Sequence, residues 1–209
     1  MTSTNTHFSP KARRWAAVVG FTTLAVLVLR LYLSALDLGG VGTALLELSR
    51  FFTILTNALV MLVMLQVAYS SKPASASLVS AIVMSIIGVG LVYHALLAHL
   101  WEPQGLELLA DHCVHTVVPL MSFAWWLVFI DKKALNFKQP LVWALWPVAY
   151  SLFTLVRSSF SNLYPYPFLD VTTHGYGQIM LNIVGLSIAF ICIGLVLVGI
   201  GRVLSSRTT

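Results

Sequence analysis

Charged residues are scarce in this chain. Asp, Glu, Lys and Arg make up 9% of its 209 residues, and hydrophobic residues make up 58%. A soluble domain carries about 25% charged residues, so the composition excludes an ordinary soluble protein and indicates a surface that faces lipid. The hydrophobic runs also lack the two-residue alternation of a membrane β-barrel. The sequence therefore predicts a bundle of transmembrane helices.

Cysteine and the common catalytic motifs are also rare or missing. Cys113 and Cys192 fall in different hydrophobic runs and at different expected depths, which places them too far apart for a disulfide. The chain contains no glycine-rich phosphate loop, no G-x-S-x-G and no H-E-x-x-H. These absences argue against nucleotide-binding proteins, α/β-hydrolases and zinc peptidases.

Six hydrophobic runs organise the chain into a single transmembrane domain, residues 1–209. Most approach the roughly 20 residues that cross a bilayer core of ~30 Å. The runs cover residues 14–36, 51–70, 77–99, 111–131, 140–157 and 178–201. We predict an all-α integral membrane protein with six spans, of which 140–157 is the shortest.

Basic residues indicate the orientation of the spans. Nine of the twelve fall before or at the first residue of the first run, in the second or fourth connection, or after the last run: Lys11, Arg13, Arg14, Lys72, Lys132, Lys133, Lys138, Arg202 and Arg207. Positive charge marks the cytoplasmic side, so we expect both termini there. The net charge of +5 is then an orientation signal and an attraction to anionic membrane lipids, and it does not indicate a nucleic-acid surface.

Polar residues gather at one depth, near the opposite, outer side. An ionisable side chain inside a span costs several kcal/mol unless it is paired or hydrated, so their common depth predicts one polar pocket. The residues at this depth are Arg30, Thr53, Thr56, Asn57, His94, His99, Asp111, His112 and His115.

Helical spacing suggests how some of these residues interact. Asp111 and His115 are four residues apart and share a face, so the carboxylate is expected to orient the imidazole. Thr53 lies at a similar depth on the second run and gains reactivity if a base removes its proton. His94 and His99 are separated by about 140° around their helix, and we expect the deeper His94 to point inward. The ordinary alternative for a membrane threonine is a hydrogen bond within its own helix.

Two other functions remain open from the residues alone. His94, His112 and His115 could hold a metal ion or haem between the third and fourth spans. The cluster could instead bind a lipid head group in a protein that carries or binds lipid without catalysis. The segment between the last two runs, Asn162 to Asp170, alternates aromatic residues and prolines, so Tyr164 and Tyr166 belong either to a stiff flap over the pocket or to interfacial anchors.

Three short motifs carry a resemblance to a known family. They are Phe51-Phe52-Thr53-Ile54-Leu55-Thr56-Asn57, Asp111-His112-Cys113-Val114-His115-Thr116-Val117-Val118-Pro119 and Tyr164-Pro165-Tyr166-Pro167-Phe168-Leu169. In this order the chain resembles the androgen-induced and androgen-dependent TFPI-regulating proteins, six-span threonine hydrolases that cleave fatty acid esters of hydroxy fatty acids. The resemblance implies a prokaryotic-type member in a bacterial plasma membrane, with Thr53 as nucleophile, Thr56 as the alternative, and His115 as the essential histidine.

The hypothesis that follows is hydrolysis of a lipid ester that enters from the membrane, without a cofactor. His115 is expected to activate Thr53 and Asp111 to orient His115, while Asn57, His112 or Arg30 donates to the oxyanion. Further residues are expected to bind the substrate: Phe52, His94, His99, Tyr164, Tyr166 and Trp126.

Overall fold

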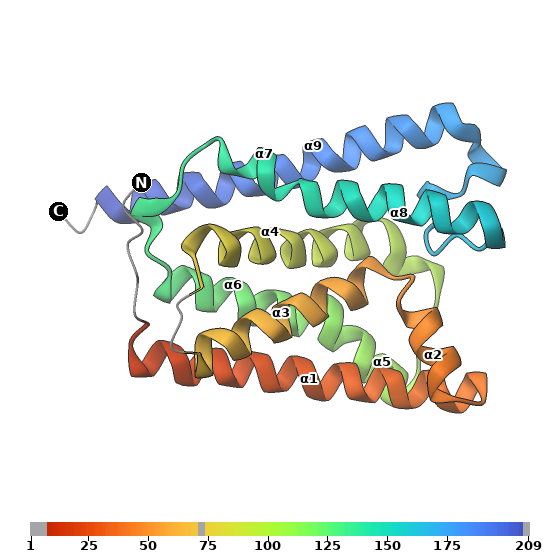
Figure 1. Cartoon of the computed structure of the whole chain (residues 1–209), viewed down its shortest axis with the longest axis horizontal. Coiled ribbons are helices and arrows are strands. Elements are labelled where there is room, and N and C mark those ends of the chain that lie inside the picture. The colour runs from red at the N-terminus through yellow and green to blue at the C-terminus, as the bar shows by residue number, and fades with distance from the viewer. Residues whose placement is uncertain (1–7, 71–73, 207–209) are drawn as a thin grey trace.

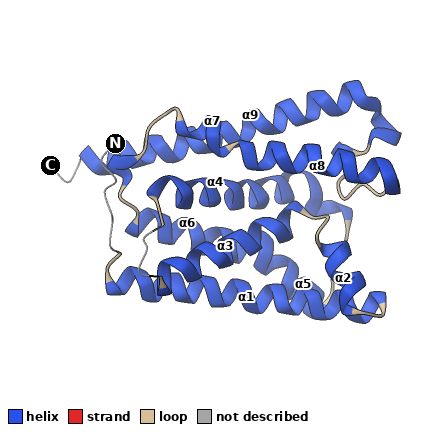
Figure 2. Cartoon of the chain, viewed as in Figure 1, coloured by secondary structure: helices blue, strands red, loops and turns tan. Residues whose placement is uncertain are grey.

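A computed structural model describes residues 8–70 and 74–206, so Lys72 and Arg207 of the orientation argument lie outside the described residues. The described part contains helices and connections and no strand (Figure 2). Six helical segments are long and apolar enough to cross a membrane, and the predicted fold class is confirmed. They are Pro10–Leu38, Phe52–Tyr69, Ala76–Leu100, Gly105–Phe129, Gln139–Ser161 and Val171–Ser206.

Several segments consist of more than one helix. The first, second and sixth are α1 (Pro10–Leu38), α3 (Phe52–Tyr69) and α9 (Val171–Ser206). The third is α4 (Ala76–Val92) followed by a π-helical turn, Tyr93–Leu97, and a 3₁₀ turn, Ala98–Leu100. The fourth is α5 (Gly105–His112), a π-helical turn, Cys113–Val117, and α6 (Val118–Phe129). The fifth is α7 (Gln139–Trp143) and α8 (Leu145–Ser161), and Pro147 explains its break because proline cannot donate to the carbonyl of Trp143.

The outer connections differ from the sequence-based expectation. A short helix that we did not predict, α2 (Val41–Leu48), follows the left-handed Gly39. Arg157 of α8 donates to the Ser49 hydroxyl and to the Leu46 carbonyl, both at 2.8 Å. The connection to the sixth span is shorter than expected because α9 already begins at Val171, where Asp170 accepts from the Thr172 N–H at 2.9 Å.

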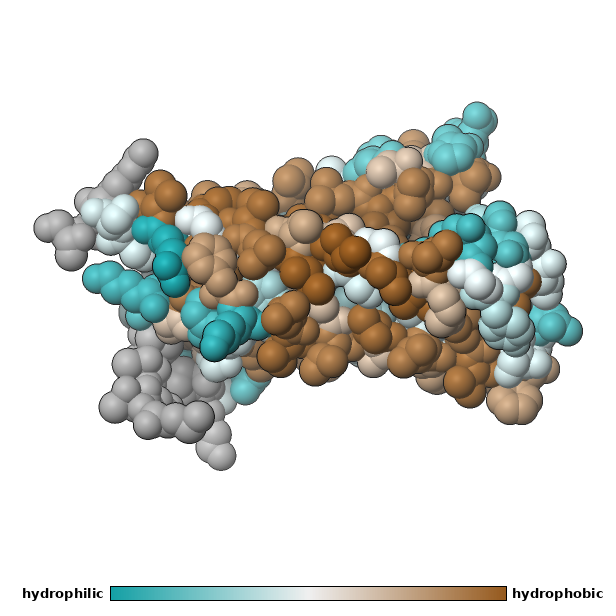
Figure 3. Space-filling view, turned by 90° about the horizontal axis from the view of Figure 1, so that it is seen from above, coloured by the Kyte–Doolittle hydropathy of each residue, from teal (hydrophilic) through white to brown (hydrophobic). Residues whose placement is uncertain are grey.

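The helices form one elongated bundle (Figure 1). α1 packs along α3, and α4 lies in the middle, in contact with α3, α6 and α9. The start of α1 and the end of α9 lie at the same end of the bundle (Figure 1), as the charge pattern predicts. Hydrophobic side chains cover the middle of the face in Figure 3, and hydrophilic ones gather at its two ends.

The core near the chain termini contains tryptophans with structural partners. Trp126 is fully buried and donates through Nε1 to the Ser80 hydroxyl at 2.8 Å. Its expected place in the substrate pocket is therefore wrong. Trp125, its neighbour, donates to the carbonyl of Ala12 at 2.9 Å and joins α6 to α1.

Candidate active site

A threonine and a histidine from different helices meet in the outer half of the bundle. Oγ1 of Thr53, in the first turn of α3, lies 3.2 Å from Nε2 of His115 in the π-helical turn before α6. Thr53 is 8% exposed and the His115 side chain 12% exposed. The contact between these two residues that the sequence predicted is present.

The other ring nitrogen fixes the tautomer of His115. Nδ1 lies 3.1 Å from the Asp111 carboxylate and 3.1 Å from the Asp111 carbonyl oxygen. Both groups are acceptors, so Nδ1 carries the proton, and Nε2 of the neutral ring has a free lone pair toward Thr53. The spacing of Asp111 and His115 thus produces the expected orientation of the imidazole.

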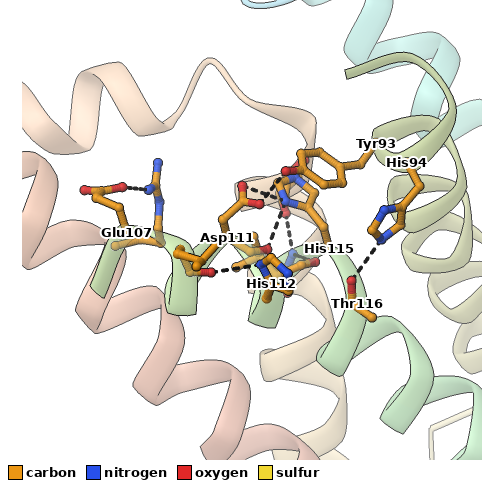
Figure 4. A network of polar contacts seen from close by, with 12 residues as sticks. Tyr93, His94, Glu107, Asp111, His112, His115 and Thr116 are labelled. Carbon is orange, nitrogen blue, oxygen red and sulfur yellow. Dashed lines mark hydrogen bonds and ion pairs between the residues drawn. The ribbon is translucent and has the colours of Figure 1, made fainter. Parts of the chain in front are cut away.

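Tyr93 completes this group, and the sequence reasoning missed it. Its hydroxyl donates to the second oxygen of the Asp111 carboxylate. Its ring stacks on the His115 ring, with centroids 3.7 Å apart and an interplanar angle of 7° (Figure 4). Tyr93 therefore holds both the imidazole and the carboxylate that orients it. The sequence could have suggested Tyr93 because it directly precedes His94. The direction of the Tyr93 side chain, however, depends on the local change from an α-helix to a π-helical turn.

Both sides of the site contain a π-helical turn. Tyr93 begins the turn at Tyr93–Leu97, and His115 lies in the turn at Cys113–Val117. Such turns are rare and occur frequently at functional sites because they redirect side chains and free backbone groups. The end of α4 packs closely against the second turn: a Cβ on Gly90 would lie 2.9 Å from the His115 carbonyl oxygen. Only glycine at this position allows α4 to approach the histidine so closely.

The other polar residues of α3 have structural partners. Asn57 donates through Nδ2 to the carbonyls of Thr53 at 2.8 Å and Val114 at 3.3 Å. It joins the nucleophile's helix to the histidine's helix, and its donors are occupied, so it is not an oxyanion donor in this arrangement. Thr56 is fully buried and accepts from Nε1 of Trp146 at 3.1 Å. The geometry favours Thr53 over Thr56 as the partner of His115.

Two cavities meet at Thr53. The first, of about 300 Å³, contains the polar groups Arg30, Asp111 and His115 beside Thr53. The second, of about 50 Å³, lies between α4, α8 and α9 and has a mainly apolar wall. Thr53, Leu97 and Tyr166 line both cavities. The walls of both cavities are mostly apolar, but only the first, which we call the polar cavity, contains charged side chains. This difference suits a substrate with a polar reacting group and a hydrocarbon part.

Tyr166 covers the first turn of α3. The N–H of Thr53 has no acceptor within its helix and approaches the buried Tyr166 hydroxyl at 3.5 Å. Burial raises the pKa of Tyr166, so the hydroxyl keeps its proton and can donate. The aromatic segment thus lies over the pocket, as the flap alternative predicted, although Tyr164 of the same segment lines none of the described cavities.

Arg30 borders the polar cavity from α1. Its guanidinium pairs with Glu107 of α5 and lies over the Trp101 ring, 5.9 Å from the centroid. Arg30 therefore adds positive charge to the cavity, and its ion pair connects the first span to the fourth.

The remaining predicted histidines lie outside the Thr53 cavities. His94 is exposed and its Nε2 lies 2.9 Å from the Thr116 hydroxyl, in a second groove between α4, α6 and α9 (Figure 4). Its expected inward direction is wrong because the π-helical turn points Tyr93, not His94, at His115. His99 lines a surface pocket beside His174, and His112 is exposed with Nδ1 near the Leu108 carbonyl at 3.1 Å.

This arrangement gives no support to the metal or haem alternative. His94, His112 and His115 do not converge on one point, and the described residues contain no group of three His, Cys, Asp or Glu able to hold a metal ion. Comparisons of the chain with family models, with curated proteins and with solved structures give no match. The geometry of the site therefore carries the functional argument.

Proposed function

We propose that the protein is an intramembrane lipid ester hydrolase that uses Thr53 as nucleophile and His115 as general base. The observation that carries the proposal is the 3.2 Å contact between Thr53 Oγ1 and His115 Nε2, made by a histidine whose other nitrogen faces only acceptors. The resemblance of the sequence motifs to membrane threonine hydrolases agrees with this assignment of roles.

In the first step, Thr53 Oγ1 attacks the carbonyl carbon of the ester and its proton passes to Nε2 of His115. The negative charge on the carbonyl oxygen is stabilised by the Tyr166 hydroxyl, which accepts from the Thr53 N–H at the positive end of α3 and still has its own proton to donate. The Asp111 carboxylate stabilises the imidazolium that forms. The C–O bond then breaks, and His115 returns the proton to the departing alcohol.

In the second step, water reaches the acyl-threonine through the polar cavity. His115 removes a proton from this water as its oxygen attacks the acyl carbon. The threonine oxygen leaves and recovers the proton from His115, and the carboxylic acid is released. The cycle consumes one water for each ester and needs no cofactor.

Activity-based labelling tests the proposal. Purified protein in detergent is treated with a fluorophosphonate that carries an alkyl chain, and the modified residue is identified by peptide mass spectrometry. We expect labelling on Thr53 and its loss in both Thr53→Ala and His115→Ala. Thr116→Ala is the matched control, because Thr116 also contacts a histidine, at 2.9 Å, but lies outside both cavities at Thr53.

Equal elution volume and thermal stability would show that the variants remain folded. Labelling that persists in both Thr53→Ala and His115→Ala would reject the assignment. Lipid that copurifies with a protein that no probe labels would favour a binding or transport function instead.

A further inference from the structure

A large aromatic side chain occupies the wall of the apolar cavity at Thr53. Phe190 lines this cavity between α4, α8 and α9, is 4% exposed and contacts Phe52 edge-to-face at 5.7 Å. The Phe190 ring lies against the bare backbone of Gly88: a Cβ there would be 2.2 Å from the ring. Phe190 on α9 and Gly88 on α4 therefore form a closely packed part of the cavity wall.

The polar atoms in the wall of this cavity are already hydrogen-bonded. Ser151 donates to the Pro147 carbonyl at 2.9 Å, and Ser187 donates to the Ile183 carbonyl at 2.7 Å. The hydroxyl of Tyr150 donates to the carbonyl of Arg50. With these donors occupied, the cavity presents hydrocarbon and aromatic surface to a ligand and favours an apolar group.

The position of His115 decides which part of an ester enters which cavity. The departing alcohol takes its proton from His115, and the second-step water gives its proton to the same nitrogen. His115 also lines the groove between α4, α6 and α9, but Thr53 does not. Of the two cavities that Thr53 lines, His115 lines the polar one and not the apolar one. The alcohol and the water therefore use the polar cavity, and the acyl chain is left with the apolar one.

We infer that the cavity between α4, α8 and α9 is the acyl-binding site and that Phe190 limits the length of the acyl chain. This inference rests on the proposed hydrolase function. The cavity volume is about 50 Å³, against about 300 Å³ for the cavity that contains His115. The acyl site is therefore the smaller of the two cavities and selects a short acyl chain.

The inference is tested with p-nitrophenyl esters of two, four, eight and twelve acyl carbons. The ratio of kcat/KM between two esters, compared between wild type and variant in the same detergent, cancels the partition of each ester into micelles. We expect the wild-type protein to prefer the two- and four-carbon esters to the eight- and twelve-carbon esters. Phe190→Ala should raise the ratio of the eight-carbon to the four-carbon rate by about tenfold, because one methylene in a pocket changes the rate by roughly 10- to 200-fold.

Two further variants distinguish the effect of a changed cavity volume on the acyl ratios from the effect of a general loss of stability. Ser187→Leu adds volume to the wall and should lower the four-carbon rate relative to the two-carbon rate. Leu197→Ala is the matched control, because Leu197 is 2% exposed on the same helix but lies outside the acyl cavity, and it should leave the ratios unchanged.

The possible failures are distinguishable. If Phe190→Ala changes the acyl ratios no more than Leu197→Ala does, the acyl-site assignment is wrong while hydrolysis stands. The acyl-site assignment is also wrong if Phe190→Ala instead changes the preference among butyrate esters of different alcohols. If the wild-type protein hydrolyses no ester of any length, the proposed function fails and the acyl site with it.

Discussion

The two ends of the bundle use similar polar side chains in different ways. Near the chain termini, Trp126 donates to Ser80, and the ammonium of Lys132 donates to the carbonyls of Leu127 at 2.7 Å and Ile130 at 3.1 Å. Burial lowers the pKa of Lys132, although nearby Asp131 opposes the shift. The Trp126 indole and the Lys132 ammonium thus both have structural partners.

At the outer end, polar groups form a connected series that ends at a cavity. Tyr93 contacts Asp111, Asp111 contacts His115, and His115 contacts Thr53, which lines both cavities. The comparison teaches that hydrogen bonding alone does not distinguish a structural polar group from a reactive one. The two kinds of polar group are distinguished by whether the last group of the series, here Thr53, borders a cavity.

A substitution where α4 approaches His115 is expected to have the largest effect on the reactive end of the bundle. Gly90→Ala places a methyl group against the His115 carbonyl, so the backbone that carries the imidazole must shift. Because a misplacement of about 1 Å can cost roughly 100-fold, we expect kcat/KM for ester hydrolysis to fall by about 10- to 100-fold. Gly185→Ala is the control, since a Cβ at Gly185 meets no atom within 4 Å. Equal activity of both variants would contradict the importance of this contact.

Removal of one hydroxyl tests whether the series acts as a unit. Tyr93→Phe keeps the ring on His115 but loses the hydrogen bond to Asp111. We expect kcat to fall by about tenfold, equivalent to about 1.4 kcal/mol, with little change in KM, because substrate does not depend on this hydroxyl for binding. Tyr32→Phe, at a tyrosine 56% exposed, should leave both constants unchanged. A change in KM alone would assign Tyr93 to substrate binding.

The opposite result is expected at the other end of the bundle. Trp126→Phe removes the hydrogen bond to Ser80 and leaves unfilled volume in the core. It should lower stability by about 1–2 kcal/mol, seen as a lower melting temperature in detergent, while the folded protein keeps its kcat. A loss of kcat without a loss of stability would show that the two ends are not functionally separate.

The smallest effect is expected at the start of α9. Hydrogen bonds from Thr172 and Thr173 lower the pKa of Asp170. A carboxylate with a lowered pKa in the folded state stabilises the fold above its ordinary pKa of 3.8, and this contribution is lost as the pH falls below that value. Asp170→Ala should therefore lower the melting temperature slightly at pH 7 and less at pH 3. If the difference in melting temperature between wild type and Asp170→Ala were larger at pH 3 than at pH 7, this explanation would be wrong.

The sequence by itself determined the class of protein, because hydrophobic runs long enough to cross a bilayer have few alternatives to helices in lipid. It also placed Thr53 and His115 at one depth, since depth follows from counting residues along a span. The i, i+4 relation of Asp111 and His115 followed from helical geometry in the same way.

Only the tertiary structure decided which polar groups face one another. The π-helical turn at Tyr93–Leu97 directs Tyr93 onto His115 and leaves His94 with Thr116, and spacing rules that assume a regular helix cannot anticipate it. Trp126 and Asn57 likewise found partners on neighbouring helices. The physical reason is that depth is a property of one helix, whereas rotation about its axis is fixed by the packing of its neighbours.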